Sequence, residues 1–317
     1  MSFAKTCIVG LDKVPPAARG CVLSIGNFDG VHLGHHRIIE TARTLADTHA
    51  RPVAVMTFEP PPDLVLRPAD VPQRLTPLDR RCEMLHQAGA DVVVIARSTR
   101  QLLSLDPQEF IDKVLMRVFA PTHVVEGTNF RFGHGRAGNV QTLRSAGEVI
   151  GFGVHEVEPL MIELPGEGKM RVSSTLVRSL VATGQVALAR RCLGKPYVLF
   201  GSVIRGEGRG RKLKFPTANL SQGEQIIPAD GVYAAKAQVG DESFAAAVSI
   251  GTKPTFGLAP RAIEAFLIDA SGDFYRRQMT LHMLERLRGQ VKFANTDELK
   301  RQIANDVQKV REIYERL

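Results

Sequence analysis

The sequence has few cysteines and lacks the long apolar segments of membrane proteins. No apolar run reaches the roughly 18–20 residues that span a bilayer, and the first six residues hold no long apolar segment of a secretory signal. The four cysteines are scattered without the spacing of a metal site, at Cys7, Cys21, Cys82 and Cys192. Internal repeats and low-complexity linkers are also absent. These absences favour a protein of the reducing cytoplasm with no membrane partner.

What the chain does have is length, apolar content and positive charge. Its 317 residues are 44% apolar and carry a formal net charge of +8, and this length favours two domains. Part of the excess is local, because the segment from Arg205 to Lys214 holds five basic residues and one acid, Glu207. A basic chain binds either nucleic acid or a small polyanion such as ATP. Without zinc-finger spacing or a Lys/Arg tail, we expect the small polyanion and no nucleic acid.

The first part of the chain alternates strand-like and helix-like segments. Predicted strands cover residues 21–25, 53–58, 91–96 and 123–125, and predicted helices cover residues 38–46, 77–86 and 106–118. This alternation predicts a doubly wound parallel sheet with helices on both faces. Ligands of such sheets bind at the carboxyl ends of the strands.

The pattern changes from about Tyr197. Short strand-like runs separated by turn residues cover 197–204, 231–239, 243–250, 261–269 and 279–283, which predicts an antiparallel barrel or sandwich. An apolar stripe between Leu299 and Leu317 then predicts one closing helix. We place the boundary near residues 191–196 and expect domains at 1–192 and 193–317.

The most informative motif is the glycine-rich turn from Gly26 to His36, which joins a predicted strand to a predicted helix. A helix N-terminus offers unpaired N–H groups to an anion, and His32 and His35 can meet phosphate there. A structural turn with incidental surface histidines is the alternative, but the three glycines beside the His pair favour a site. The absence of a following Gly-Lys-Ser/Thr indicates a nucleotidyltransferase type of site and not a kinase P-loop. Two histidines do not complete a zinc site.

Two further segments accompany this turn. Gly127–Asn139 follows a predicted strand and combines aromatics, glycines and arginines; by itself it fits either a ring-and-phosphate site or a surface loop. Val172–Arg178 offers three hydroxyl groups and a guanidinium for a triphosphate. By itself, that segment is better explained as an ordinary helix cap with a solvated arginine.

The second part holds two candidate features. Gly206–Leu220 is a basic, glycine-rich loop that ends in Pro-Thr-Ala-Asn, where Thr217 and Asn219 offer neutral oxygen ligands to Mg²⁺. A nucleic-acid loop or a hairpin tip is the alternative. Glu264 alternates with Phe266 and Ile268 on one strand face. Partial desolvation there would raise its pKa, as in a general base, whereas an edge-strand glutamate in water fits the alternation equally well.

Taken together, these motifs resemble the bifunctional prokaryotic riboflavin kinase/FAD synthetase family over nearly the whole chain. In the first domain the resemblance lies in Gly26–His35, Asn129–Gly133 and Ser173–Thr175 with Arg178. In the second it lies in Gly208–Arg211, Phe215–Asn219, Pro228–Tyr233, Pro254–Phe256 and Glu264. The resemblance implies an N-terminal nucleotidyltransferase domain and a C-terminal small antiparallel β-barrel with a terminal helix.

The resemblance also implies two reactions and their sites. The second domain would phosphorylate riboflavin to FMN with ATP, and the first would transfer AMP from ATP to FMN, giving FAD and pyrophosphate, both with Mg²⁺. The implied catalytic residues are Glu264, His32 and His35. The implied ATP-binding residues are Gly26, Phe28, Gly34, Asn129, Ser173, Ser174, Thr175, Arg178, Gly206, Gly208, Gly210, Arg211, Thr217 and Asn219. The implied flavin-binding residues are Phe58, Pro60, Phe130, Arg131 and Phe132, and the implied Mg²⁺ ligands are Thr217 and Asn219.

The chain departs from the family pattern at Lys214, Glu126 and Glu59, where the family usually has glycine, a small apolar residue and aspartate. We expect a monomer or weak homo-oligomer. Two alternatives remain open: an adenylyl- or cytidylyltransferase for another phosphate acceptor, and a non-catalytic regulator that binds flavin or nucleic acid.

Overall fold

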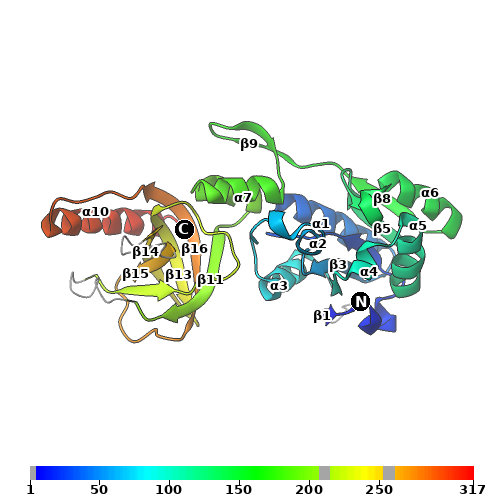
Figure 1. The fold of residues 1–317 in the computed structure, drawn as a ribbon, viewed down its shortest axis with the longest axis horizontal. Coiled ribbons are helices and arrows are strands. Elements are labelled where there is room, and N and C mark those ends of the chain that lie inside the picture. Colours follow the sequence, from blue (N-terminus) through cyan, green and yellow to red (C-terminus); the bar gives the residue numbers. More distant parts are fainter. Residues whose placement is uncertain (1–4, 207–214, 253–260) are drawn as a thin grey trace. The chain divides into compact units, whose positions relative to one another are not determined.

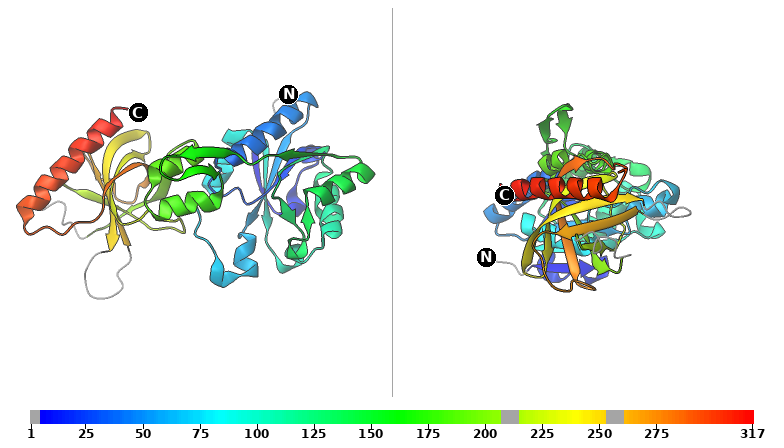
Figure 2. Two further views of the ribbon diagram at one scale, coloured as in Figure 1. Left: turned by 90° about the horizontal axis from the view of Figure 1, so that it is seen from above. Right: turned by 90° about the vertical axis from the view of Figure 1, so that its left-hand side faces the viewer.

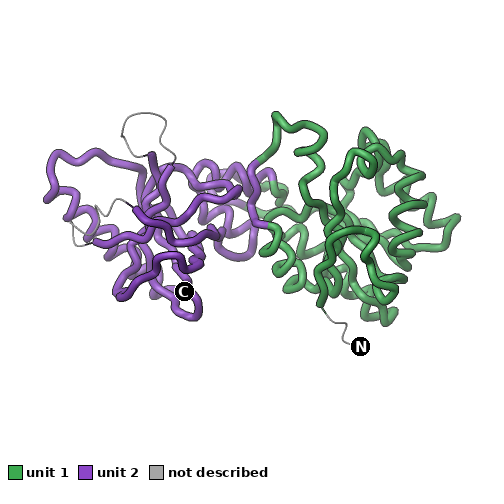
Figure 3. Tube along the Cα trace, turned by 60° about the horizontal axis from the view of Figure 1, so that its bottom comes forward, with its two compact units in different colours: residues 1–72, 78–163, 169–174 green, residues 73–77, 164–168, 175–317 purple. Residues whose placement is uncertain are grey.

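The computed structural model describes residues 5–206, 215–252 and 261–317. It divides into two compact units, coloured in Figure 3. The first unit comprises Met1–Pro72, Leu78–Glu163 and Lys169–Ser174, and the second comprises Gln73–Pro77, Leu164–Gly168 and Thr175–Leu317. The predicted residues Gly208, Gly210, Arg211 and Lys214, and the segment 254–256, lie outside the described residues.

The first unit is built on a six-stranded parallel sheet, as the alternating pattern predicted (Figure 1). Its strands are β1 (Thr6–Val9), β2 (Val22–Ile25), β3 (Val53–Glu59), β4 (Val92–Arg97), β5 (His123–Gly127) and β8 (Gly153–Val157). Its larger helices are α1 (Leu33–Thr48), α3 (Leu78–Ala88), the continuous pair α5 (Pro107–Phe110) and η4 (Ile111–Phe119), and α6 (Val140–Ile150). Shorter elements are η1 (Leu11–Lys13), η2 (Pro16–Ala18), α2 (Pro62–Leu66), η3 (Pro68–Asp70), α4 (Arg100–Leu103), β6 (Arg131–Phe132), η5 (His134–Arg136) and β7 (Gly138–Asn139).

Each face of this sheet is covered by its own helices. On one face, α1 and α3 bury Ile39 and Leu85 in an apolar cluster with Val93 and Val125. On the other, η4 and α6 contribute to a second cluster that contains Val124. Because side chains alternate along a strand, neighbouring residues of one strand serve opposite clusters. Both faces are therefore buried, as in other parallel sheets.

The strand order places a ligand crevice at one point of the sheet. The order is β1-β4-β3-β2-β5-β8, so the chain builds from β2 towards β4 and then continues on the other side of β2 with β5 and β8. In open parallel sheets, ligands bind at the carboxyl ends of the strands where the order reverses in this way. The predicted segments Gly26–His36 and Gly127–Asn139 follow the two strands at this point.

The second unit contains a closed antiparallel barrel with one long helix, as the resemblance implied. Its strands, in the order β11-β12-β15-β14-β13-β16, are β11 (Tyr197–Ile204), β12 (Thr217–Leu220), β15 (Arg261–Leu267), β14 (Glu242–Thr252), β13 (Gly231–Val239) and β16 (Gln278–Arg288). The helix α10 (Thr296–Tyr314) packs against the outside of β13 and β14 (Figure 2). The remaining elements within the described residues are β9 (Met161–Leu164), β10 (Gly168–Arg171), α7 (Ser174–Ala182) and α8 (Val186–Leu193).

An ion pair joins α10 to the barrel. Asp306 is 3% exposed and accepts hydrogen bonds from Arg288 Nη2 at 2.8 Å and Nε at 3.0 Å. We expect Asp306→Ala to lower the free energy of unfolding by about 3 kcal/mol, because it leaves a half-buried guanidinium without its partner. Urea denaturation followed by circular dichroism measures this, with the exposed Asp297→Ala in the same helix as control. Equal stability of the two variants would contradict the expectation.

Seven of the described strands were not predicted, namely β1, β6, β7, β8, β9, β10 and β12. β1 is short, lies at the sheet edge and exposes three of its four residues, so it lacks the apolar run that marks a buried strand. β8 is half-buried and carries His155 and Glu156. The sequence pattern assigned the residues of β12 to the end of the glycine-rich loop Gly206–Leu220. Within the described ranges, no helix is both long and apolar enough to cross a membrane.

Candidate functional site

The turn between β2 and α1 has a strained backbone. Phe28 and Val31 have φ angles of 48° and 40°, a region that costs a non-glycine residue about 1–3 kcal/mol and is least favourable for a β-branched one. Such a conformation persists only where the surroundings hold it. Here the carbonyl oxygen of Asn27 accepts from Thr57 Oγ1 and Arg81 Nη1, both at 3.1 Å. Asp29 O accepts from Ser174 Oγ at 2.8 Å.

That last bond brings two of the predicted motifs together. Ser174 lies 145 residues after Asp29, yet it anchors the same turn that carries the two histidines. Arg81, at 2% exposed, also contacts Glu59, with Nη2 3.2 Å from Oε2. The turn is therefore fixed by side chains from β3, α3 and the start of α7.

His32 and His35 lie together at the beginning of α1. His32 caps the helix, because its Nδ1 accepts from the His35 backbone N–H at 3.2 Å; in a neutral ring this leaves the proton on Nε2. The two rings stack with centroids 3.6 Å apart. A Cβ on Gly34 would lie 3.1 Å from ring atoms of His32, so glycine permits this close arrangement.

His35 has an unused polar atom. Its Nδ1 is buried and has no hydrogen-bond partner among the described residues. Burial lowers the pKa of His35 well below its usual value, and the neighbouring His32, His36 and Arg81 lower it further. The ring is therefore neutral at pH 7 before any anion binds. An unpaired buried nitrogen beside a helix N-terminus is an arrangement suited to a phosphate group.

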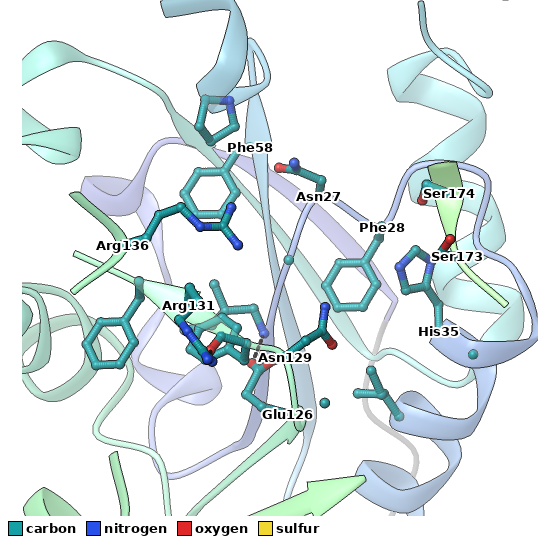
Figure 4. A pocket seen from close by; sticks show the side chains of 18 of the residues that line it. Asn27, Phe28, His35, Phe58, Glu126, Asn129, Arg131, Arg136, Ser173 and Ser174 are labelled. Atoms are coloured by element: carbon teal, nitrogen blue, oxygen red, sulfur yellow. Dashed lines mark hydrogen bonds between the residues drawn. The ribbon is translucent and has the colours of Figure 1, made fainter. Parts of the chain in front are cut away.

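These residues line a cavity of about 720 Å³ in the first unit (Figure 4), a size usual for small-molecule sites. Its lining includes twelve of the predicted site residues, namely Gly26, Phe28, His32, Gly34, His35, Phe58, Asn129, Phe130, Arg131, Phe132, Ser173 and Ser174. Pro60 is not among the described residues of the lining, although Pro62 and Asp63 of α2 are.

The two sides of the cavity differ in character. The histidines come from α1, on one face of the sheet. Phe58 and Phe130 pack against the apolar cluster of the opposite face, and Phe130 and Phe132 stack with centroids 5.6 Å apart. One side thus offers donors for phosphate and the other offers flat apolar surface for a ring system.

Thr175 and Arg178 belong to the second compact unit. There, Arg178 Nε donates to the carbonyl oxygen of Gln73 at 2.9 Å. Gln225 anchors the same short segment, since its Nε2 donates to Leu75 O at 2.9 Å. Nothing in the sequence pattern indicated that residues 73–77 join the second unit.

The barrel brings its candidate residues onto one face. Asn219 of β12 lies directly opposite Glu264 of β15, and Thr217 opposite Phe266. Side chains at such paired positions have Cβ atoms about 4.5–5.5 Å apart. Glu264 is half-buried, and on its other side it pairs with Ser249 of β14.

The face is therefore more polar than the strand containing Glu264 suggested. The hydroxyl, amide and carboxylate oxygens of Thr217, Asn219, Glu264 and Ser249 form a donor set of the hard oxygen type that Mg²⁺ prefers. Gly206 completes the arrangement, because a Cβ there would overlap the amide of Asn219. The described residues contain no cluster of three or more His, Cys, Asp or Glu side chains placed to hold a metal ion, and on this face Glu264 is the single carboxylate among the four.

Sequence patterns missed several residues of these sites. Asn27 and Arg136 line the cavity. The sequence patterns indicated the segments that contain them, but did not indicate either residue as part of a site. Ser249 has no local signal, because its role depends on the register between β14 and β15. Glu126, noted only as a departure from the family, is a buried residue of the cavity wall.

Comparison with known proteins assigns each unit to a family. Residues 14–176 match the family described as FAD synthetase, and residues 193–314 match the family described as riboflavin kinase. Proteins described as bifunctional riboflavin kinase/FMN adenylyltransferase are similar over most of the chain. The one from Escherichia coli (strain K12) is 36% identical over 296 residues, with 93% of each chain covered. The one from Bacillus subtilis (strain 168) is 35% identical over 292 residues, with 90% of each covered.

A solved structure shares the fold over nearly the full length. It comes from Streptococcus pneumoniae and is described as a macrolide-efflux protein; it is 27% identical, with a TM-score of 0.87, and covers 97% of this chain and 98% of its own. The classification follows from two findings. The chain matches both families, and its relatives with the same two-part description are similar to it over about nine-tenths of their length. The chain belongs to the family of bifunctional riboflavin kinases/FMN adenylyltransferases.

Proposed function

We propose that this protein makes FAD from riboflavin in two ATP-dependent steps. Residues 193–317 phosphorylate riboflavin to FMN, and residues 1–192 adenylylate FMN to FAD with release of pyrophosphate. The observation that carries the proposal is that two parts of one chain match two different families, and that each part contains its own set of candidate phosphate-binding residues.

In the adenylyl transfer, a phosphate oxygen of FMN attacks the α-phosphorus of ATP, and the bond to pyrophosphate breaks. His32 and His35 contact the ATP phosphates and stabilise the negative charge that develops at the transferring phosphorus. Binding of the triphosphate raises the pKa of His35 by placing anionic charge beside it. The α1 N-terminus adds backbone N–H donors on the same side.

The remaining residues of this site position the two substrates. ATP is held by Gly26, Phe28, Gly34, Asn129, Ser173, Ser174, Thr175 and Arg178, the last of these binding the β- and γ-phosphates. The flavin ring lies against Phe58, Pro60, Phe130, Arg131 and Phe132. Phosphoryl and nucleotidyl transfer depend on such positioning more than on covalent catalysis.

In the kinase reaction, Glu264 removes the proton from the ribityl 5′-hydroxyl group of riboflavin as that oxygen attacks the γ-phosphorus, and ADP leaves. Thr217 and Asn219 would hold Mg²⁺ and ATP beside it. Gly206 would contact the phosphates, and the resemblance implies the same role for Gly208, Gly210 and Arg211, which lie outside the described residues. When bound, Mg²⁺ neutralises charge on the phosphate oxygens. The enzyme acts in the cytoplasm as a monomer or weak homo-oligomer, without nucleic acid or membrane.

The bond between Ser174 and the turn gives a direct prediction. Ser174→Ala should lower kcat/KM for FMN adenylylation about tenfold, because the strained turn loses one anchor, a loss of roughly 1.4 kcal/mol. Formation of FMN from riboflavin should be unchanged. Ser179→Ala, at an exposed position of the same helix, is the control; a similar loss in both variants would contradict a specific role for Ser174.

The acceptor is tested with a panel of substrates. The purified protein is incubated with [α-³²P]ATP, Mg²⁺ and FMN, phosphopantetheine or nicotinamide mononucleotide, and the products are separated. We expect AMP transfer to FMN alone. Transfer to another acceptor in preference to FMN would support the alternative of a different nucleotidyltransferase. Salt-sensitive RNA or DNA binding without turnover of any flavin would support a non-catalytic regulator.

A further inference from the structure

Glu126 occupies an unusual position for a carboxyl group. It follows Val124 and Val125 in β5, beside β2 at the point where the strand order reverses. Strand alternation places Glu126 on the side of Val124, which packs in the cluster containing Phe132, and away from the α1 side that carries His35. Its side chain thus lies on the aromatic side of the cavity.

The carboxyl group is buried and has one hydrogen bond. Glu126 is 3% exposed, and the backbone N–H of Ile25 donates to its Oε1 at 2.6 Å. No other hydrogen bond or ion pair reaches it from the described residues. Burial raises its pKa well above the usual value, and the bond from Ile25 offsets this only in part. Burial thus favours the protonated, neutral form of this carboxyl group.

A protonated carboxyl group in a cavity wall can form hydrogen bonds to a ligand both as donor and as acceptor. Glu126 is one of the residues of the cavity wall (Figure 4). The bond from Ile25 uses one lone pair of Oε1, so the second lone pair of Oε1 and the proton on Oε2 are left for a ligand. An acid group of this kind donates one hydrogen bond and accepts another side by side, and so matches a heterocycle edge that carries an N–H next to a carbonyl oxygen.

We propose that Glu126 determines flavin specificity in the adenylyltransferase site by hydrogen-bonding the imide edge of the isoalloxazine ring, formed by N3–H and its flanking carbonyl oxygens. This inference rests on the proposed function. The amidine edge of adenine has a similar donor–acceptor pair, but the position of Glu126 on the side of Phe58, Phe130 and Phe132 assigns it to the flavin. Glu126 acts through ligand binding and takes no part in proton transfer.

The test compares Glu126→Val with Glu126→Gln in the full-length protein. Val removes both hydrogen-bonding atoms, whereas Gln keeps an acceptor for Ile25 and a donor for the ligand. We expect Val to raise KM for FMN at least about tenfold, because the loss of one hydrogen bond weakens binding by about this factor. The values of kcat and of KM for ATP should stay within about threefold of wild type. Gln should keep KM for FMN within about threefold.

A matched control is available on the next strand. Glu156 of β8 is the register partner of Glu126, but it is exposed and pairs with Arg144. Glu156→Val and Glu156→Gln should leave both Michaelis constants unchanged. Thermal melting and the rate of FMN formation from riboflavin verify that each variant is folded.

A flavin analogue keeps the proposal falsifiable if Glu126→Val does not fold. 3-Methyl-FMN lacks the N3–H, so the wild-type enzyme should bind it at least about tenfold more weakly than FMN. Equal KM values for FMN and 3-methyl-FMN in the wild type would overturn the inference. A rise of KM for ATP instead of FMN in the Val variant would overturn it in favour of an adenine contact. Absence of any FAD formation by the wild type would instead contradict the proposed function.

Discussion

Replacement of His35 by alanine is expected to lower kcat/KM for FAD formation from FMN by about 10²–10³-fold. His35 has a buried Nδ1 with no partner in the described part of the chain, and it lies at the N-terminus of α1, where the ring and the helix N–H groups face the same cavity. Its removal deprives the transferring phosphorus of a donor that cannot be replaced by water in a buried position.

The same variant should leave FMN formation from riboflavin unchanged, since the barrel does not use this residue. The two rates are measured separately by separating the flavins after incubation with either FMN or riboflavin. His49→Ala is the matched control, because His49 caps the opposite end of the same helix and is exposed. A His35→Ala enzyme that retains more than about one-tenth of its adenylylation activity would contradict the assignment.

The second large effect concerns the barrel. Glu264→Gln should lower riboflavin phosphorylation by about 10²–10⁴-fold, the usual contribution of a general base, while FMN is still converted to FAD. Gln preserves the size of the side chain and its place opposite Asn219 and Ser249. A loss of riboflavin phosphorylation would therefore result from the loss of the carboxylate and not from a change in packing.

Glu285→Gln serves as the control for Glu264, because Glu285 is an exposed glutamate on another barrel strand. Loss of both activities in a folded Glu264→Gln protein would show that the two sites are not independent, or that the assignment of Glu264 is wrong. Unchanged phosphorylation of riboflavin would remove Glu264 from the mechanism.

Sequence patterns were most informative where the signal is local. Apolar runs followed by helical periodicity identified the central strands of the parallel sheet, because a strand covered on both faces must be apolar throughout. The position of the turn from Gly26 to His36, between β2 and α1, was predicted correctly from the sequence. Its role in phosphate binding stays a prediction. The exposed edge strand Thr6–Val9 has no such signal.

Features that depend on register or distant contacts were out of reach. The pairing of Asn219 with Glu264 follows from how β12 and β15 align, which neither strand encodes alone. Cys7 and Cys82 have sulfur atoms 3.1 Å apart, although their spacing in the sequence indicated nothing. The burial of Glu126 likewise becomes visible only once β5 lies beside β2.

The central claim is that one chain carries both reactions. Its most direct test is to incubate the purified full-length protein with riboflavin, ATP and Mg²⁺ and to separate the flavins at successive times. We predict that FMN appears first and FAD follows with stoichiometric pyrophosphate. Neither product should form without ATP. FMN without FAD would contradict the adenylyltransferase assignment, and the absence of both FMN and FAD would contradict the account as a whole.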